Sequence, residues 1–253
     1  MKTLAINTAS LRAYLNHLTA LQPKLDHLLT KVRGSPKPEV VHQTRVTLRQ
    51  IRTALYLAKL SDKSLAIGKI DLELKSLSSA LSDLRELNVA IQNAKIFHVT
   101  IPQQELKLQR ARRKIKVKLN RQRQIKILRK LTHFTQKIKL DPALELKKGL
   151  KGLRKKMKPL LHHAVSSDEK THQFRLKMKK VRYSLEMINC PQAKLVELQR
   201  HLGRVCDLAS LERFSGKNEE IEKQKEKEKL KAESLAPKAI KHTLKLLKYD
   251  AHP

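Results

Sequence analysis

One block of this sequence occurs twice, and each copy has the pattern of an amphipathic helix. The segment 41–57 reads VHQTRVTLRQIRTALYL, and the segment 171–187 reads THQFRLKMKKVRYSLEM. The identical pairs at equivalent offsets are His42/His172, Gln43/Gln173, Arg45/Arg175, Arg52/Arg182 and Leu55/Leu185. The positive charge of Arg49 is kept by Lys179. This duplication of a helix predicts two similar helical units related by pseudo-two-fold symmetry.

The polar positions of each copy fall on one side of the expected helix. At about 100° per residue, the histidine and the three cations that follow it lie within roughly 80° of one another. We call these sets the first basic ridge, made of His42, Arg45, Arg49 and Arg52, and the second basic ridge, made of His172, Arg175, Lys179 and Arg182. An apolar stripe beside the first ridge is expected to face a core, namely Val41, Thr44, Leu48, Ile51 and Leu55. Because arginine forks grip phosphate oxygens in a bidentate manner and histidine adds a donor, the repetition indicates anion binding rather than a solvated face.

Most of the remaining chain has leucines at three- and four-residue spacing, which predicts helices. The expected helices span 10–31, 38–60, 62–92, 103–139, 143–163, 192–213 and 237–249, besides the helix of the second ridge. The charge-dense segment 218–233 fits a solvated helix and a mobile linker equally well. No segment has the sustained alternation of a strand, so we expect an all-α single domain over 1–253, with one repeat in 1–140 and the other in 141–253.

The charge balance points to a polyanionic partner. Lysine and arginine total 56 against 23 acidic residues, which gives a net charge of +33. Self-repulsion of that size disfavours the folded state unless a polyanion offsets it. Four Phe, four Tyr and no Trp offer few platforms for stacked bases, which speaks against a binder of single strands. Duplex nucleic acid, an anionic membrane and inorganic polyphosphate all remain open on composition.

Three further basic clusters are candidates for contact with the same ligand. They comprise Arg113, Lys116 and Arg123 in the segment 103–139, Lys151, Arg154 and Lys158 in the second half, and Lys241 and Lys245 in the last helix. Each cluster also fits an ordinary solvated surface.

The sequence contains no recognisable targeting or membrane-spanning segment. The N-terminal residues MKTLAINTASLRAYL lack the long apolar core of a signal peptide, and no stretch approaches about 18 uninterrupted apolar residues. Cys190 and Cys206 are far from any CxxC spacing and are expected to be reduced thiols. We therefore expect a soluble cytoplasmic protein.

The repeated block resembles a known family. HQxRVxxRxxR from His42 and HQxRxxxKxxRY from His172 are similar to the histidine motifs of the CHAD domain, the conserved-histidine α-helical domain. DLRELNVAI at 83–91 and LQRHLGRVCDLASL at 198–211 resemble the family's second motif, again once in each half. The resemblance covers about 11–249. It implies two four-helix bundles with a basic groove between them, and binding of inorganic polyphosphate by the two ridges that line the groove.

The sequence departs from the family pattern at its acidic positions. Glu86 and Asn88 stand where the family commonly has aspartates, and Cys206 precedes Asp207 where the first half has Arg85. These departures weaken any assignment of a metal site there. We interpret Arg85, Glu86 and Asp207 as structural partners of buried arginines.

No catalytic machinery is visible in the sequence. The run Asp71-Leu72-Glu73-Leu74-Lys75 mimics the ExExK spacing of triphosphatase domains that often accompany this family. It lies in a helical leucine repeat, however, and a helix would point its three charges in different directions. A Walker loop and clustered carboxylates for two-metal chemistry are also lacking. We expect no enzyme activity, no catalytic residue, no cofactor and no metal.

The sequence thus predicts non-catalytic binding of inorganic polyphosphate, at polyphosphate granules, with enzymes of polyphosphate metabolism as further partners. One alternative is a sequence-nonspecific binder of duplex nucleic acid, which would otherwise act as a competing polyanion. A weaker alternative is hydrolysis of polyphosphate or triphosphate.

Overall fold

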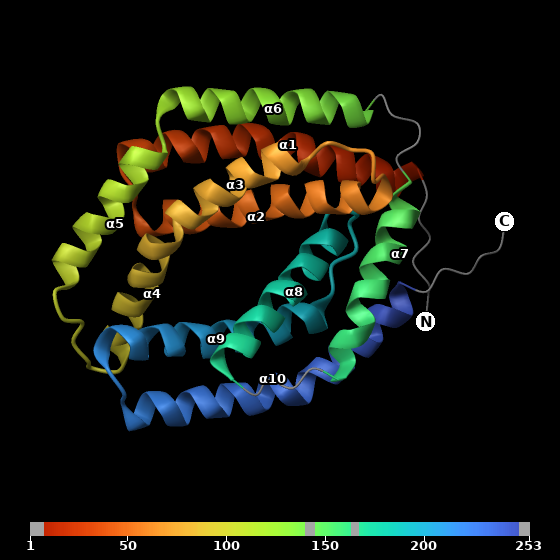
Figure 1. The fold of residues 1–253 in the computed structure, drawn as a ribbon. Coiled ribbons are helices and arrows are strands. Elements are labelled where there is room, and N and C mark those ends of the chain that lie inside the picture. The colour runs from red at the N-terminus through yellow and green to blue at the C-terminus, as the bar shows by residue number, and fades with distance from the viewer. Residues whose placement is uncertain (1–7, 140–144, 163–166, 248–253) are drawn as a thin grey trace.

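The computed structural model describes residues 8–139, 145–162 and 167–247. Within these ranges every regular element is a helix, so the all-α prediction is confirmed. The helices are arranged as a ring, with the N-terminal elements on one side and the C-terminal elements on the other (Figure 1). No helix in the described ranges is both long and apolar enough to cross a membrane.

The first two helices carry the first basic ridge and its support. α1 (Thr8–Gly34) packs along α2 (Pro38–Ser61). Pro38 occupies the first turn of α2, where the N–H that proline lacks is not needed. Between the two helices, the hydroxyl of the buried Tyr14 donates to the carbonyl of Ala54 at 2.9 Å. This contact helps to fix the face that α2 presents to the rest of the molecule.

The segment 62–92, predicted as one helix, forms two. These are α3 (Gly68–Ala80) and α4 (Ser82–Ile96). At their junction the Ser78 carbonyl accepts hydrogen bonds from the guanidinium of Arg45 (3.0 Å) and from the Ser82 hydroxyl (3.0 Å). The hydroxyl contact is the usual bond of a helical serine to the carbonyl four residues before it, whereas Arg45 reaches this junction from another helix. The prediction of one uninterrupted helix was wrong, and a ridge arginine binds at the junction.

The segment 103–139 is divided in the same way. It forms α5 (Gln104–Lys118) and α6 (Arg121–Lys139), separated at Leu119 and Asn120. The side-chain oxygen of Asn120 accepts from the backbone N–H of Arg123 at 2.8 Å, as a capping residue does at the start of a new helix. α5 packs on the outside of α4, and α6 lies along α1 (Figure 1).

The C-terminal part begins with α7 (Leu146–Met157), which continues as the short 3₁₀ helix η1 (Lys158–His162). α8 (Asp168–Glu186) carries the second ridge, and α9 (Ala193–Ser215) follows it. α7 packs against α2, and α9 packs against α4. Buried apolar residues of both halves belong to one continuous core. The predicted boundary between 140 and 141 lies outside the described residues, and the division into two bundles stays a prediction.

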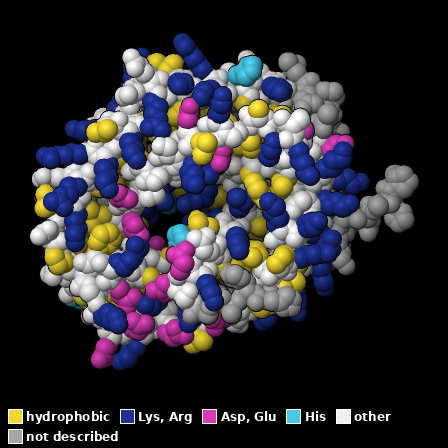
Figure 2. Space-filling model, viewed as in Figure 1, with side chains coloured by type: hydrophobic (Ala, Val, Ile, Leu, Met, Phe, Trp, Pro, Cys, Tyr) yellow, Lys and Arg dark blue, Asp and Glu magenta, His cyan; other side chains and the backbone are white. Residues whose placement is uncertain are grey.

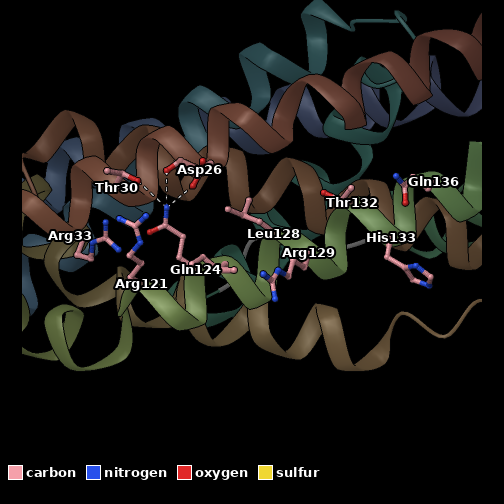
Figure 3. A pocket seen from close by; sticks show the side chains of 11 residues that line it. Asp26, Thr30, Arg33, Arg121, Gln124, Leu128, Arg129, Thr132, His133 and Gln136 are labelled. Carbon is pink, nitrogen blue, oxygen red and sulfur yellow. Dashed lines mark hydrogen bonds between the residues drawn. The ribbon is translucent and has the colours of Figure 1, made fainter.

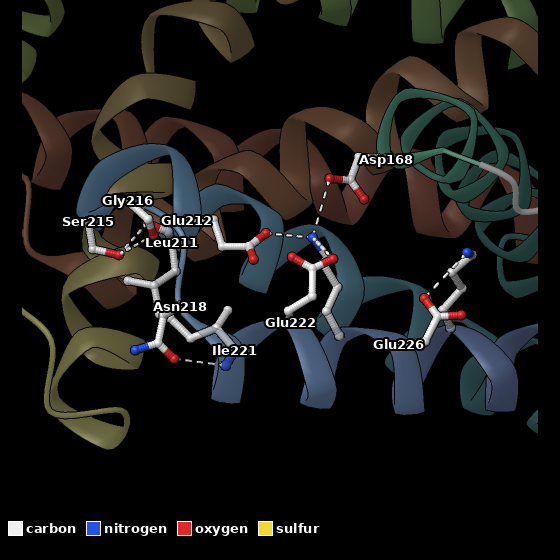
Figure 4. Close-up of polar contacts among 11 residues, drawn as sticks. Asp168, Leu211, Glu212, Ser215, Gly216, Asn218, Ile221, Glu222 and Glu226 are labelled. Carbon is white, nitrogen blue, oxygen red and sulfur yellow. Dashed lines mark hydrogen bonds and ion pairs between the residues drawn. The ribbon is translucent and has the colours of Figure 1, made fainter.

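The charge-dense segment 218–233 is helical. It belongs to α10 (Glu219–Leu246), a single helix that also contains Pro237, which was predicted to open a separate helix. The ammonium of Lys225 lies 2.5 Å from Glu212 of α9 and 3.8 Å from Asp168 at the start of α8 (Figure 4). Further along, His201 of α9 and Glu228 are 2.5 Å apart. These contacts with its neighbours hold the segment as a helix and exclude the linker alternative.

Candidate functional site

The molecule is hollowed near the middle of the face seen in Figure 2. The hollow lies at the place that α2, α4, α8 and α9 surround in Figure 1. Lys and Arg side chains cover much of this face, whereas Asp and Glu gather toward one edge. Because α2 and α8 carry the two ridges and pack against each other, both ridges belong to this region.

The structure brings the two basic ridges within electrostatic reach of each other. Arg175 of the second ridge lowers the pKa of both Arg45 and Arg49 of the first, in addition to the larger effect of burial. For Arg45 the combined effect lowers the pKa to about 10. Arg49 is also hydrogen-bonded to Tyr183 on α8, which partly offsets the effect of burial. Residues that are far apart in the sequence therefore form one cationic cluster.

Lys179 is the most strongly perturbed member of this cluster. Burial is the largest cause, and the neighbouring charges of Arg175 and Arg49 add to it. Together they lower the pKa of Lys179 to about 5, despite the opposing carboxylate of Asp207. In the ligand-free protein near neutral pH, this amine is therefore uncharged. An anion placed beside it would favour its protonation.

The two repeat histidines have similar surroundings. The pKa of His42 is lowered by burial and by Arg85, and the pKa of His172 is lowered by burial and by Arg175. Both rings are therefore neutral near pH 7 in the absence of ligand. Each retains a ring N–H that could donate to a phosphate oxygen.

The repeated glutamine makes the same hydrogen bond in both copies. Gln43 donates to the carboxylate of Glu39 at 2.9 Å, and Gln173 donates to Glu169 at 2.7 Å. Each acceptor lies four residues before its glutamine, so the duplication begins earlier than the motif that revealed it. Glu39 and Glu169 were not among the predicted residues, although their shared offset from the histidine is visible in the sequence.

The ends of both ridges are held by carboxylates. Arg52 forms a two-pronged contact with Asp71 of α3, at 2.7 and 3.2 Å. Arg182 lies 3.0 Å from Glu186, one turn further along α8. Arg45 is used in part to hold the junction between α3 and α4. The central part of the cluster, formed by Arg49, Arg175 and Lys179, is thus the part best placed to receive a ligand.

Residues of α4 and α9 complete the cluster. The charge of Asp207 influences Arg85, Lys179 and Arg175, and burial raises the pKa of Asp207 against the effect of these cations. A Cβ added to Gly203 would lie 3.4 Å from the guanidinium of Arg175, so glycine lets this arginine pack close to α9. Arg85 was interpreted as structural, yet it lies within electrostatic reach of the ridge residue Arg175. Its position in the motif at 83–91 is the sequence feature that could have identified it as part of the cluster.

Arg175 also has an unused donor. Its Nε is buried and has no hydrogen-bond partner in the structure. A buried N–H of a guanidinium without an acceptor carries a desolvation cost that an anionic oxygen would remove.

The remaining candidate cations are distributed over other elements. Arg123 donates to the hydroxyl of Ser76 at 3.0 Å, and Arg154 donates to the carbonyl of Leu244 at 3.4 Å, so both connect helices. The others are exposed, on α5, on α7 with its 3₁₀ continuation, and on α10: Arg113, Lys116, Lys151, Lys158, Lys241 and Lys245. In Figure 1, α5 lies on the far side of α4 from the hollow.

Asp71 and Glu73, from the ExExK-like run, also have structural partners. Asp71 binds Arg52, and Glu73 lies 2.5 Å from Lys130 of α6. Both charges thus join α3 to neighbouring helices. Among the described residues, no three His, Cys, Asp or Glu side chains are grouped as ligands of a metal ion would be.

Two cavities lie apart from the centre of the cluster. One, of about 510 Å³, is formed between α1 and α6 (Figure 3). The other, of about 470 Å³, is lined by α9 and α10 and includes Arg204 and Asp207. The second cavity therefore adjoins the cluster through Asp207, whereas the first is lined by none of the ridge residues.

Comparison with known proteins gives a consistent result. The family model of the CHAD domain matches residues 19–216. Among solved structures, the crystal structure of the CHAD domain from the plant Ricinus communis has a TM-score of 0.62 at 18% sequence identity, and the alignment covers 96% of this chain and 94% of that one. No curated protein matches the chain. At this identity the solved structure supports the fold alone.

Proposed function

The chain belongs to the CHAD domain family, and on that basis we propose that it binds inorganic polyphosphate through the cluster formed by its two basic ridges. The observation that carries this proposal is the approach of Arg45 and Arg49 on α2 to Arg175 and Lys179 on α8. The guanidinium charges of Arg45, Arg49 and Arg175 repel one another in the ligand-free protein, and a polyanion placed among them relieves the repulsion.

The chemistry of the cluster suits a chain of phosphates. Guanidinium groups of Arg49 and Arg175 supply pairs of donors in a plane, which match the oxygens of a phosphate. Lys179 adds a charge that forms as the anion binds. Aromatic platforms for bases are scarce in the sequence, and a phosphate polymer needs none. These features favour polyphosphate over a single-stranded nucleic acid.

The proposed role is binding without catalysis. We place the protein in the cytoplasm at polyphosphate granules, where it would anchor or organise enzymes of polyphosphate metabolism. Duplex nucleic acid is the competing candidate, because a basic surface can bind its phosphates without reading bases.

A calorimetric titration with polyphosphate tests the proposal. In the double variant Arg49→Gln, Arg175→Gln, two charge-assisted contacts are lost, each worth about 1.5–3 kcal/mol, so the affinity should fall at least about 100-fold. The matched control is Lys223→Gln, Lys227→Gln, which removes the same charge from exposed positions of α10. An equal loss of affinity in both variants would show that net charge, rather than the ridges, determines binding.

Competition distinguishes polyphosphate from nucleic acid and from an enzymatic role. Duplex DNA at equal phosphate concentration should displace polyphosphate poorly from the wild-type protein. Equal displacement would favour the nucleic-acid alternative. Release of orthophosphate from long-chain polyphosphate in the presence of Mg²⁺ or Mn²⁺ would establish a hydrolase instead.

A further inference from the structure

The cavity between α1 and α6 has the composition of a second anion site. Eleven side chains line it, and its charged groups include the guanidiniums of Arg33, Arg121 and Arg129 (Figure 3). Asp26 is the one carboxylate in this lining. One oxygen of Asp26 already accepts a hydrogen bond from the side-chain amide of Gln124 at 2.6 Å. The cavity therefore has an excess of positive charge that its own carboxylate does not balance.

The wall of the cavity is fixed in place by Gln124. The buried amide nitrogen of this residue also donates to the hydroxyl of Thr30 at 2.9 Å and to the carbonyl of Asp26 at 3.2 Å, which ties α6 to α1. Arg33 and Arg121 lie next to each other beside Gln124 (Figure 3). A wall held in place by hydrogen bonds, with two neighbouring cations beside it, is a preorganised arrangement for an anion.

Unused hydrogen-bonding capacity supports the same interpretation. Nη1 of Arg33 is buried and has no hydrogen-bond partner. A guanidinium N–H removed from water without an acceptor is costly, and an anionic oxygen in the cavity would supply that acceptor. Oε1 of Gln124, a buried acceptor in the same lining, also lacks a partner, so the guanidinium of Arg33 is the group of this lining that an anion would satisfy.

The shape of the site favours an elongated ligand. Arg121 and Arg129 are eight residues apart on α6, which places them about 12 Å apart along the axis at 1.5 Å per residue. Consecutive phosphates of a chain could contact both arginines along this span. The other polar members of the lining are Thr30, Thr132, His133 and Gln136.

The cavity and the basic ridges lie on different sides of the layer formed by α1 and α2. α6 lies on the outside of α1, and α1 packs along α2, which carries the first ridge (Figure 1). The ridges on α2 and α8 face each other on the inner side of this layer. A ligand in the α1–α6 cavity is therefore separated from a ligand at the ridges by the thickness of packed helices, each about 10 Å across with its side chains.

We propose that the α1–α6 cavity is a second phosphate-chain site, so that one protein molecule holds two stretches of polyphosphate on different sides of the α1–α2 layer and crosslinks them. This inference rests on the proposed function, because it assumes that the ridges bind the first stretch. Crosslinking would let the protein act as a scaffold for polyphosphate. Many weak bridges between long chains add up, because each bridge already formed raises the effective concentration for the next.

Stoichiometry with short-chain polyphosphate tests the second site. We expect the wild-type protein to bind two short chains, and the triple variant Arg33→Gln, Arg121→Gln, Arg129→Gln to bind one, which is a two-fold reduction at unchanged ridge affinity. Thermal unfolding followed by circular dichroism verifies that the variant is folded. The charge-matched control, Lys217→Gln, Lys223→Gln, Lys227→Gln, should still bind two.

Light scattering with long-chain polyphosphate tests the crosslinking. The wild-type protein and the control should produce large assemblies, and the cavity variant should not. The inference is overturned if the cavity variant binds two short chains, or if it scatters light as the wild-type protein does. It is also overturned if orthophosphate at equal phosphate concentration blocks the cavity as well as the polymer does, or if duplex DNA fills it in preference to polyphosphate.

The ridge and cavity proposals fail in different ways. If Arg49→Gln, Arg175→Gln leaves the ridge affinity unchanged, the proposed function is wrong whatever the cavity does. If that variant loses its tighter site but the cavity variant keeps both sites, the ridge proposal survives and the crosslinking proposal does not.

Discussion

The lowered pKa of Lys179 reflects its burial among the cations of the two ridges. Its amine is half-buried beside Arg175 and Arg49, and its pKa of about 5 is far below the ordinary lysine value of 10.5. Arginine cannot shed its proton in this way, so the second ridge relieves part of its repulsion at the one position where it carries lysine instead. The difference between Arg49 and Lys179 in the two repeats therefore has a physical consequence.

The first prediction concerns the pH dependence of stability. Between about pH 5 and pH 10 the unfolded chain binds a proton at Lys179 that the ligand-free folded protein does not, so stability should rise with pH. In Lys179→Met this contribution is absent, and the free energy of unfolding should rise less steeply, by up to about 1.4 kcal/mol per pH unit. Urea unfolding at pH 6, 7 and 8 measures the slopes. Parallel slopes for wild type and variant would show that Lys179 is charged in the folded protein.

Asp207 is the counterpart of Lys179 among the acidic groups. It is half-buried, and Arg175, Lys179 and Arg85 all act on it. As an internal carboxylate it partly neutralises the cations that the proposed ligand would contact. Asp207 therefore competes with the ligand for these cations.

The second prediction is that Asp207→Asn strengthens polyphosphate binding without weakening the ligand-free fold. We expect affinity to rise about 10-fold, because the cations no longer share an internal counter-charge. Burial outweighs the cations and raises the pKa of Asp207, so its ionised carboxyl costs free energy in the folded protein, and the free energy of unfolding near pH 7 should not fall in the variant. Calorimetry and urea unfolding measure the two effects. Asp83→Asn is the matched control, since Asp83 pairs with Lys114 at the exposed junction of α4 and α5. Weaker binding by Asp207→Asn would show that this carboxylate positions cations rather than competing for them.

At the scale of elements, the approach of α7 to α2 depends on one glycine. A Cβ at Gly149 would lie 2.3 Å from the Ser61 hydroxyl and 2.9 Å from the Leu57 carbonyl of α2. The backbone carbonyl cannot move aside without shifting the helix. At Gly152, one turn later on α7, the nearest atom to an added Cβ is a side-chain carbon of Leu60 at 3.4 Å.

The third prediction compares these two glycines. Gly149→Ala should lower the free energy of unfolding by about 1–3 kcal/mol, because overpacking separates α7 from α2. Gly152→Ala should be neutral or should stabilise by up to about 1 kcal/mol, because alanine is the better helix former. Thermal and urea unfolding of both variants provide the measurement. Equal effects would mean that helix propensity, rather than the contact with Ser61 and Leu57, governs this position.

Helices were predicted well where the apolar residues are regularly spaced, and poorly where contacts with other helices determine the structure. It identified α1, α2 and α9 within a few residues because their buried stripes are strong. The break between α3 and α4 could not be read from the leucines, since Leu77, Leu81 and Leu84 keep the helical spacing across it. The contact with Arg45 at this junction comes from another helix. Likewise, 218–233 has few apolar residues, and its helix is held by partners such as Glu212 and His201 that only the fold brings near.

The same reasoning applies to the candidate site. The ridges were predictable because the duplication and the helical period together place their charges on one face. The pairing of Arg52 with Asp71 was not predictable, since Asp71 comes from another helix, whereas Glu186 follows Arg182 by four residues on the same helix and could have been identified from the sequence. Arg85 and Asp207 were recognised as a family motif, but their approach to Arg175 and Lys179 follows from the packing of α4 on α9 beside α8.

At the scale of the whole molecule, the ring brings elements of both halves together. α2 and α4 of the first half pack against α7 and α9 of the second, and one core includes residues of both. The two ridges can therefore approach only when the complete chain is folded. Polyphosphate bound between them would stabilise the global fold rather than one half, because a ligand that binds only the native state shifts the whole unfolding equilibrium.

The fourth prediction is that salt acts in opposite directions on the free and the bound protein. With a net charge of +33, the ligand-free protein should unfold at a higher temperature as NaCl rises from about 0.01 M to about 0.15 M, because the Debye length falls from about 30 Å to about 8 Å and self-repulsion is screened. The stabilisation given by polyphosphate should shrink over the same range, since each counterion released on binding gains less entropy at a higher salt concentration.

The salt dependence of binding also gives the number of phosphates that the protein neutralises. By analogy with DNA, log affinity should fall linearly with log salt, with a slope of about 0.7–0.9 per phosphate neutralised. Removing two ridge arginines, Arg49 and Arg175, should therefore flatten the slope by roughly 1.5, whereas Lys223→Gln, Lys227→Gln should leave it almost unchanged. Titrations at four salt concentrations resolve this difference. If both variants flatten the slope equally, the polyphosphate is held by the diffuse field of the whole molecule and not between the ridges.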